Sequence, residues 1–243
     1  MSGKLKFAVH FMNNSEAKKA IFASIRQHLA ASQPFDAAHQ AHHSQPDSEI
    51  AVSVSTEFSK ETLIGNFRES LEFVGGRFTR VYDETEAAEV LYSIIGEKSA
   101  SKIAISDSPL VKKIRGFLKI SAEFTENASA DRLFESDLGV TGAQWAIAET
   151  GTLVLEAESE RHRLTSLVPP VHVCILEARN IRQTLGEILE ILQKRLSRAV
   201  TFVTGASRTS DIELTLAIGV HGPGELHVIL IDKQEELSTD EHR

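Results

Sequence analysis

Residues 171–176 read Val-His-Val-Cys-Ile-Leu, a continuous apolar run that follows the proline pair Pro169–Pro170. A run without apolar–polar alternation predicts a strand that is covered on both faces. The segments Lys102–Ser106 and Leu226–Ile231 predict further strands. Segments with helical periodicity separate these strands, and this alternation is typical of a layered α/β domain.

The helices before residue 120 carry recognisable start and stop signals. Ser59 offers an N-cap to a helix that ends at the glycine pair Gly75–Gly76. Asp83 and Glu86 have the spacing of a capping box, which predicts the start of a second helix. Pro109 fits the first turn of a third helix over Asp107–Leu118.

The second half of the chain is richer in predicted strands. Trp145–Ala148 and Thr152–Glu156 flank a turn, and Ala199–Val203 and Leu214–Val220 precede the last strand. The loop 221–225 has the length of a hairpin connection, so we expect a mixed, mostly parallel sheet. Asn180 and Gln183 have capping-box spacing and predict a long helix that begins near Ile181.

Length and charge limit the classes of function. The 243 residues suit one large domain with an extension, and we expect an N-terminal helix and polar linker over 1–58, the main domain over 59–232 and an acidic tail over 233–243. A net charge of -8 argues against a nucleic-acid partner. No apolar run approaches the roughly 20 residues of a transmembrane helix, and no signal peptide is recognisable, so a cytoplasmic location is expected.

The chain offers little with which to hold a redox centre. It contains one cysteine, Cys174, which excludes disulfides and a cysteine-ligated iron–sulfur cluster within the chain. It also lacks the glycine fingerprint of a dinucleotide site. We therefore expect no intrinsic cofactor. The histidines of the polar linker, His39, His42 and His43, lack acidic or cysteine ligands at suitable spacing, so no metal site is expected either.

A polar segment after the predicted strand Ala199–Val203 has the composition of an anion-binding loop. Gly205 permits close approach of the backbone to a ligand, and Ser207 and Thr209 add hydroxyl donors. Arg208 could add a bidentate contact to a carboxylate or phosphate. The alternative is a plain loop whose hydroxyl groups cap the segment that follows.

Three further polar residues, Asp211, Glu213 and His221, are candidates for the same site. Asp211 and Glu213 share a face if their segment is extended, where they could perform acid–base chemistry or order the loop. His221 stands at a predicted strand end, as an acid–base group, a ligand donor or a hydrogen-bonded turn residue. His172 alternates with Cys174 along its strand, and we interpret it as a core residue or a support for a site residue.

The stretch Thr141–Thr152 is the second polar segment between apolar runs. Thr141 and Gly142 are candidate ligand-binding residues at a strand end. Glu149 lies in the tight turn before Gly151, where it could bind a ligand, order the loop or act as a nucleophile. Glu149, Glu213 and His221 are thus the candidate catalytic residues.

The segments Thr141–Thr152, Gly205–Glu213 and Gly219–Pro223 together resemble the LUD domain of the lactate utilization protein C family, over most of Lys102–Ile231. The resemblance implies a three-layer α/β/α core, similar to ribose-phosphate isomerase, glucosamine-phosphate isomerase and the coenzyme A transferases. In the related isomerases, a Gly/Ser/Thr loop after a strand binds the substrate phosphate. Coenzyme A transferases use a glutamate near a glycine-rich turn, which Glu149 matches in position only.

The resemblance also implies a function. It points to a cytoplasmic component of a system that oxidises L-lactate to pyruvate, in a multisubunit complex with iron–sulfur oxidoreductase subunits. This chain would then be a non-redox subunit that binds a small anionic ligand. The alternatives are a stand-alone isomerase or acyl/CoA transferase that acts on a small anionic metabolite, and a structural subunit with a vestigial pocket.

Overall fold

The computed structural model describes residues 58–126, 128–157, 163–194, 197–209, 217–218 and 222–233, with isolated helical residues between 19 and 27. The chain divides into two units, Met1–Thr56 and Glu57–Arg243, and the sheets of the described residues lie in the second unit. The predicted domain boundaries remain predictions. The three linker histidines lie outside the described residues.

Two capped helices frame the first strand of the second unit. Helix α2 (Lys60–Phe73) begins where the Ser59 hydroxyl accepts a hydrogen bond from the Thr62 amide at 3.1 Å. The chain leaves α2 through Gly75, whose φ of 85° lies in the left-handed region. After strand β1 (Arg77–Val81), helix α3 (Glu84–Glu97) begins at Asp83, whose carboxylate accepts from the Thr85 and Glu86 amides at 2.8 Å. Both predicted helix starts are confirmed.

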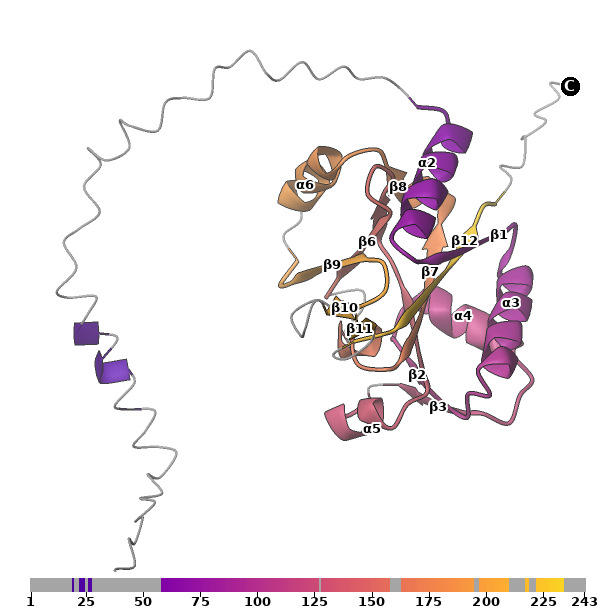
Figure 1. Cartoon of the computed structure of the whole chain (residues 1–243), viewed down its shortest axis with the longest axis horizontal. Helices are drawn as coiled ribbons and strands as arrows, with labels where there is room; N and C mark the ends of the chain where they lie inside the picture. The colour runs from indigo at the N-terminus through magenta and orange to yellow at the C-terminus, as the bar shows by residue number, and fades with distance from the viewer. Residues whose placement is uncertain are drawn as a thin grey trace, which may run out of the picture. The chain divides into compact units, whose positions relative to one another are not determined.

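A six-stranded sheet forms the centre of the unit (Figure 1). Its strand order is β1-β12-β7-β4-β2-β3, and every pairing within it is parallel. Besides β1, its strands are β2 (Lys102–Ile105), β3 (Glu123–Glu126), β4 (Leu138–Gly142), β7 (Val171–Glu177) and β12 (Glu225–Ile231). Residues Val171–Leu176 of the central strand β7 are all buried, as their apolar run predicts.

Each face of this sheet has its own apolar core. Helix α3 and helix α4 (Pro109–Phe117) cover one face, where their residues pack with those of β2, β4 and β7. Helix α2 covers the other face together with a second, four-stranded sheet, as Ile64, Phe67 and Leu71 pack with Leu153, Cys174 and Leu226. The predicted three-layer α/β architecture is therefore confirmed, with a layer that contains both a helix and a small sheet.

The second sheet has the order β8-β5-β6-β9. Its strands are β5 (Trp145–Ile147), β6 (Thr152–Glu156), β8 (Ile181–Arg182) and β9 (Val200–Thr204). The antiparallel pairs of the fold lie here and in the two-stranded ribbon of β10 (Arg208–Thr209) and β11 (Ala217–Ile218). The predicted hairpin into the last strand is wrong, because β12 pairs in parallel with β1 and β7 while β11 pairs with β10.

The predicted helix start at Asn180 is also wrong. Residues Ala178–Asn180 form the 3-10 helix η3, and Ile181–Arg182 then pairs with β5 as strand β8. Helix α6 (Leu185–Lys194) begins after Thr184, whose amide donates to Glu187 Oε2 at 2.8 Å while the Glu187 amide donates to Thr184 Oγ1 at 3.3 Å. The capping box is thus Thr184–Glu187, four residues later than predicted.

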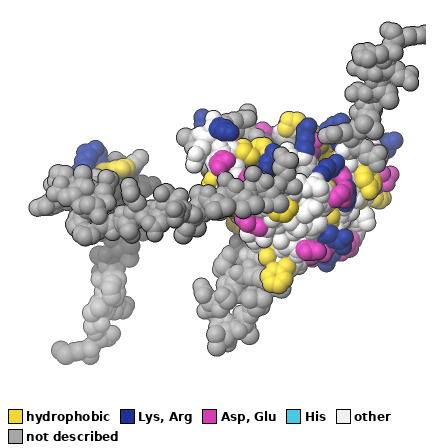
Figure 2. Space-filling model, turned by 90° about the horizontal axis from the view of Figure 1, so that it is seen from above, with side chains coloured by type: hydrophobic (Ala, Val, Ile, Leu, Met, Phe, Trp, Pro, Cys, Tyr) yellow, Lys and Arg dark blue, Asp and Glu magenta, His cyan; other side chains and the backbone are white. Residues whose placement is uncertain are grey.

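The remaining described elements are helix α5 (Ala130–Phe134) and the 3-10 helix η2 (Arg163–Ser166). On the face shown in Figure 2, acidic and basic side chains are interspersed. None of the described helices is long and apolar enough to cross a membrane.

Candidate functional site

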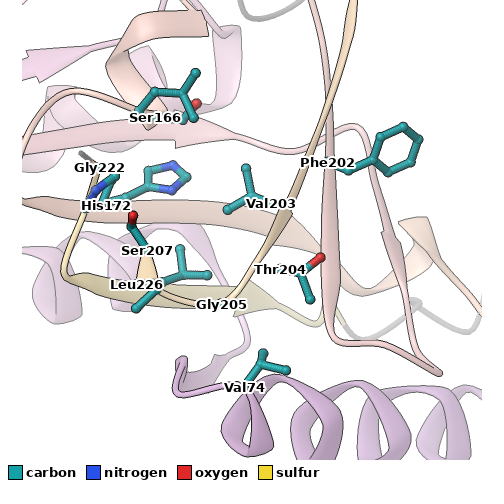
Figure 3. Close-up of a pocket in the computed structure, with 13 residues that line it drawn as sticks. Val74, Ser166, His172, Phe202, Val203, Thr204, Gly205, Ser207, Gly222 and Leu226 are labelled. Carbon is teal, nitrogen blue, oxygen red and sulfur yellow. The ribbon is translucent and has the colours of Figure 1, made fainter. Parts of the chain in front are cut away.

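A cavity of about 550 Å³ opens where the amino-terminal ends of β7 and β12 meet the end of β9 (Figure 3). The loop that precedes β7 and the C-terminus of α2 complete its wall. The described lining residues are Val74, Ser166, Leu167, His172, Phe202, Val203, Thr204, Gly205, Ala206, Ser207, Gly222, Pro223 and Leu226. The wall is thus mainly apolar with a few polar side chains, which is the usual composition of a small-molecule site.

The Gly205–Ser207 loop is fixed on both sides. Gly205 has a φ of 76°, and a Cβ atom there would lie 2.3 Å from the backbone oxygen of Val74 at the end of α2. Two residues later, the Ser207 amide donates a hydrogen bond to the Pro223 carbonyl at 2.8 Å. Only glycine satisfies both the left-handed conformation and the close approach to α2. The loop therefore presents Ser207 to the cavity from a defined backbone.

His172 is the ionisable side chain in the described lining. It is 1 % exposed, and its Nε2 atom lies 2.8 Å from Oγ1 of the fully buried Thr141. Its other ring nitrogen, Nδ1, is buried without a hydrogen-bond partner. Desolvation lowers the pKa of His172 to about 3, so the imidazole is neutral at neutral pH. Figure 3 shows the His172 ring in the same space as the side chains of Val203 and Ser207.

Two other hydroxyl groups of the lining already have protein partners. Ser166 Oγ donates to the Arg163 carbonyl at 2.8 Å. Thr204 Oγ1 lies 2.8 Å from Thr152 Oγ1, which in turn lies 2.7 Å from Thr150 Oγ1. These bonds fix the wall of the cavity, and they leave Ser207 and His172 as the side chains best placed to receive a ligand.

The structure brings three of the predicted site residues to this cavity. Gly205 and Ser207 line it, and Thr141 reaches it through its hydrogen bond to His172. Arg208 and Thr209 follow directly as strand β10, of which the structure describes the backbone. Three predicted residues lie outside the described residues: Asp211, Glu213 and His221.

Glu149 has a local role at a different place. Its Oε1 atom accepts a hydrogen bond from the Leu185 amide at 3.0 Å, at the N-terminus of α6. Its own amide donates to the Gln183 carbonyl at 3.1 Å. The carboxylate is exposed and does not line the described cavity. Glu149 therefore ties the β5–β6 turn to α6, and it stabilises the positive end of that helix.

Gly142 lines a second cavity of about 360 Å³ at the carboxyl ends of β4 and β7. This cavity also contacts Trp145, whose indole nitrogen donates to Glu156 at 3.1 Å. The segment Gly142–Trp145 thus lines a hollow that is separate from the cavity at Gly205–Ser207. Among the described residues, no group of three His, Cys, Asp or Glu side chains could hold a metal ion.

His172 lines the cavity, although the sequence analysis interpreted it as a core residue or a support for a site residue. Its alternation with Cys174 assigned it correctly to a buried face, but the pattern could not show that this face borders a cavity. The one feature of the sequence that could have indicated a role for His172 in a site is that it is a polar residue within an otherwise apolar run. The last wall of the cavity comes from β9 and the Gly205–Ser207 loop, which are distant in sequence.

A sequence model of the LUD domain matches residues 64–231. The chain belongs to the LUD domain family. The match includes both polar stretches and every strand of the six-stranded sheet.

Similar proteins include an uncharacterized protein of Neisseria meningitidis serogroup B, 40 % identical over 39 % of this chain and 42 % of the relative. The lactate utilization protein C of Deinococcus radiodurans is 40 % identical over 43 % of this chain and 50 % of the relative. That of Halalkalibacterium halodurans is 26 % identical over 59 % of this chain and 68 % of the relative. The chain spans about half the length of the first two curated relatives that it matches. The predicted resemblance to the lactate utilization protein C family is confirmed.

A solved structure has the same fold. It is a DUF162 family protein from Deinococcus radiodurans, which matches with a TM-score of 0.57 and 23 % identity over 72 % of this chain and 99 % of that chain. At this identity the likeness concerns the fold alone.

Proposed function

We propose that this protein is a component of an L-lactate utilization system and that the 550 Å³ cavity binds its small anionic ligand. The family and the names of the relatives support the pathway. The observation that carries the site is the buried His172, which lines the cavity and whose Nδ1 atom has no protein partner. Buried polar atoms are almost always hydrogen-bonded, so an unpartnered nitrogen in a side chain that lines a cavity supports a bound group there, either an ordered water or a ligand.

In this proposal, the described residues bind and orient the ligand. Ser207 supplies a hydroxyl group from the loop that Gly205 makes possible, and His172 closes the inner wall. Apolar side chains such as Val203 and Leu226 keep water out of the rest of the cavity. Arg208 follows Ser207 directly in the chain, and we include its guanidinium among the proposed ligand-binding groups.

The redox step is assigned to iron–sulfur oxidoreductase subunits that associate with this chain in the cytoplasm. A single cysteine, buried in the central strand, cannot supply the ligand set of such a cluster. The protein would thus be a ligand-binding subunit without an intrinsic cofactor. Co-purification with iron-containing partners from the native host supports this assignment, and a stable stand-alone protein with its own isomerase or CoA transferase activity contradicts it.

Calorimetric titration of the purified protein with L-lactate tests the proposed ligand. A charge-assisted hydrogen bond is worth about 1.5–3 kcal/mol, so Arg208→Ala should weaken binding by about tenfold or more. Arg68→Ala is the matched control, because Arg68 pairs with Glu72 on the exposed side of α2. An unchanged Kd in Arg208→Ala would remove Arg208 from the site, and absence of L-lactate binding by the wild type would overturn the proposed ligand.

A further inference from the structure

The His172–Thr141 pair joins two adjacent strands of the central sheet. Thr141 lies on β4 and His172 on β7, and their side chains meet at 2.8 Å in the fully buried interior. This contact occupies Nε2 and fixes the plane of the ring. The opposite ring nitrogen has no partner, although the side chain lines a cavity large enough for a small ligand.

A neutral imidazole has one N–H donor and one acceptor nitrogen, and the contact with Thr141 permits two arrangements. If Nε2 carries the hydrogen, it donates to Thr141 and Nδ1 is a bare acceptor. If the Thr141 hydroxyl donates to Nε2, then Nδ1 carries the hydrogen. Only the second arrangement offers a donor to an anion, since a carboxylate accepts hydrogen bonds but cannot donate one.

The surroundings of His172 favour a ligand with a single charge. The described lining of the cavity has no Lys, Arg, Asp or Glu side chain, and its polar side chains other than His172 are the hydroxyl groups of Ser166, Thr204 and Ser207. Full desolvation keeps the pKa of His172 at about 3, so the ring does not supply a positive charge either. With the Arg208 guanidinium as the one cation of the proposed site, these donors suit one negative charge better than the two of a phosphate dianion.

We propose that His172 is the ligand-recognition residue of this cavity: the Thr141 hydroxyl holds Nε2 as an acceptor, and Nδ1–H donates to the carboxylate of a small monocarboxylate of the 2-hydroxy acid class. Ser207 lies in the same space and meets the other polar group of that ligand. Thr141 is then a positioning residue, because it sets the tautomer without touching the ligand. The inference rests on the proposed function, and it adds the recognition group and the charge of the ligand.

Two substitutions separate the two ring nitrogens of His172. Asparagine places its amide nitrogen near the position of Nδ1, whereas glutamine places its amide near Nε2. We expect His172→Asn to bind L-lactate within a few-fold of the wild type, and His172→Gln to bind about tenfold to a hundredfold more weakly. Thr141→Val, which keeps the shape and removes the hydroxyl, should also weaken binding and change the tautomer.

The experiment combines calorimetry with ¹⁵N spectra of the histidine rings. Acetate, L-lactate and inorganic phosphate are titrated into the full chain and the three variants, and circular dichroism checks that each variant is folded. The spectrum of the wild type should show a protonated Nδ1 and an unprotonated Nε2 for His172, assigned by its loss in the His172 variants. This readout requires no ligand, and one folded His172 variant is enough for the assignment.

The outcomes distinguish the inference from the proposed function. Binding of L-lactate that is equal in wild type and His172→Gln overturns the inference alone, as does a spectrum with the hydrogen on Nε2. Binding of acetate but not L-lactate, lost in His172→Gln, supports carboxylate recognition by His172 and overturns the lactate assignment. Preference for phosphate over both carboxylates overturns the inference, and binding of none of the three probes overturns both proposals.

Discussion

Replacement of Gly205 by alanine should destabilise the protein and distort the candidate site at once. Gly205 has a φ of 76°, a conformation that costs an alanine roughly 1–2 kcal/mol. The new Cβ atom would also lie 2.3 Å from the backbone oxygen of Val74 and 3.0 Å from its side chain. Backbone cannot move aside as a flexible side chain does, so the loop or the end of α2 must shift.

The two effects together predict a loss of about 2–4 kcal/mol in the free energy of unfolding. For a chain of this size, that corresponds to a decrease of roughly 5–10 °C in Tm. Urea denaturation followed by circular dichroism gives the free energy, and calorimetry with L-lactate measures the effect on binding. Binding should weaken as well, because Ser207 lies two residues after the displaced glycine.

Gly65→Ala is the matched control for this substitution. Gly65 lies within helix α2, and a Cβ atom there would meet nothing within 4 Å. The same chemical change should therefore stabilise the protein by up to about 1 kcal/mol, since alanine favours a helix interior over glycine. A Gly205→Ala protein as stable as the wild type would refute the account of how α2 fixes this loop.

Three other expectations follow from particular contacts. The Glu149 carboxylate caps helix α6, so Glu149→Gln should lower the free energy of unfolding by about 0.5–1.5 kcal/mol in urea denaturation. The affinity for L-lactate should stay unchanged. A variant that keeps full stability but binds L-lactate more weakly would contradict this role. Hydrogen bonds from Lys233 and Lys113 lower the pKa of Glu84 from its ordinary 4.5 to about 2. The folded-state pKa is depressed, so the stabilisation is present above about pH 4.5 and disappears as the pH falls toward 2. Both lysines are about half exposed, so Glu84→Gln should cost only about 1–2 kcal/mol at pH 7, and the difference between variant and wild type should vanish near pH 2. Deletion of residues 1–48 should leave a protein with cooperative unfolding, and a loss of cooperativity would assign the N-terminal helix to the core.

The sequence predicted those parts of the fold that local chemistry determines. Ser59 and Asp83 cap their helices with the hydrogen bonds that their side chains predict. The apolar run at 171–176 forms the buried centre of the main sheet, between β4 and β12. In each of these cases, the residues that determine the helix start or the strand lie within a few positions of it in the sequence.

The errors arose where a distant strand decides the local structure. Asn180–Gln183 and Thr184–Glu187 both have capping-box spacing, and pairing of Ile181 with Ala146 of β5 extends the chain over the first of them. Likewise, the short loop before β12 suggested a hairpin, but β12 finds its partners in β1 and β7. Periodicity carries no information about such long-range pairing.

In the candidate site too, the sequence predicted the features that depend on neighbouring residues and missed those that depend on distant ones. Gly205 and Ser207 could be selected from composition, because a glycine followed by hydroxyl residues after a strand indicates a ligand loop. Glu149 has an equally suggestive position, and yet its carboxylate meets the Leu185 amide of α6. The importance of His172 depends on an empty space beside the ring, and no pattern along a strand reports an empty space.

A crystal structure of the protein with L-lactate tests the central claim most directly. The account predicts a lactate in the 550 Å³ cavity, with its carboxylate within hydrogen-bond distance of His172 Nδ1 and another of its polar groups near the Ser207 hydroxyl. The space beside Gly142 and Trp145 serves as an internal comparison, because it is the other hollow that a polar stretch of the sequence lines. Lactate bound there, with the cavity beside His172 empty, would contradict the account.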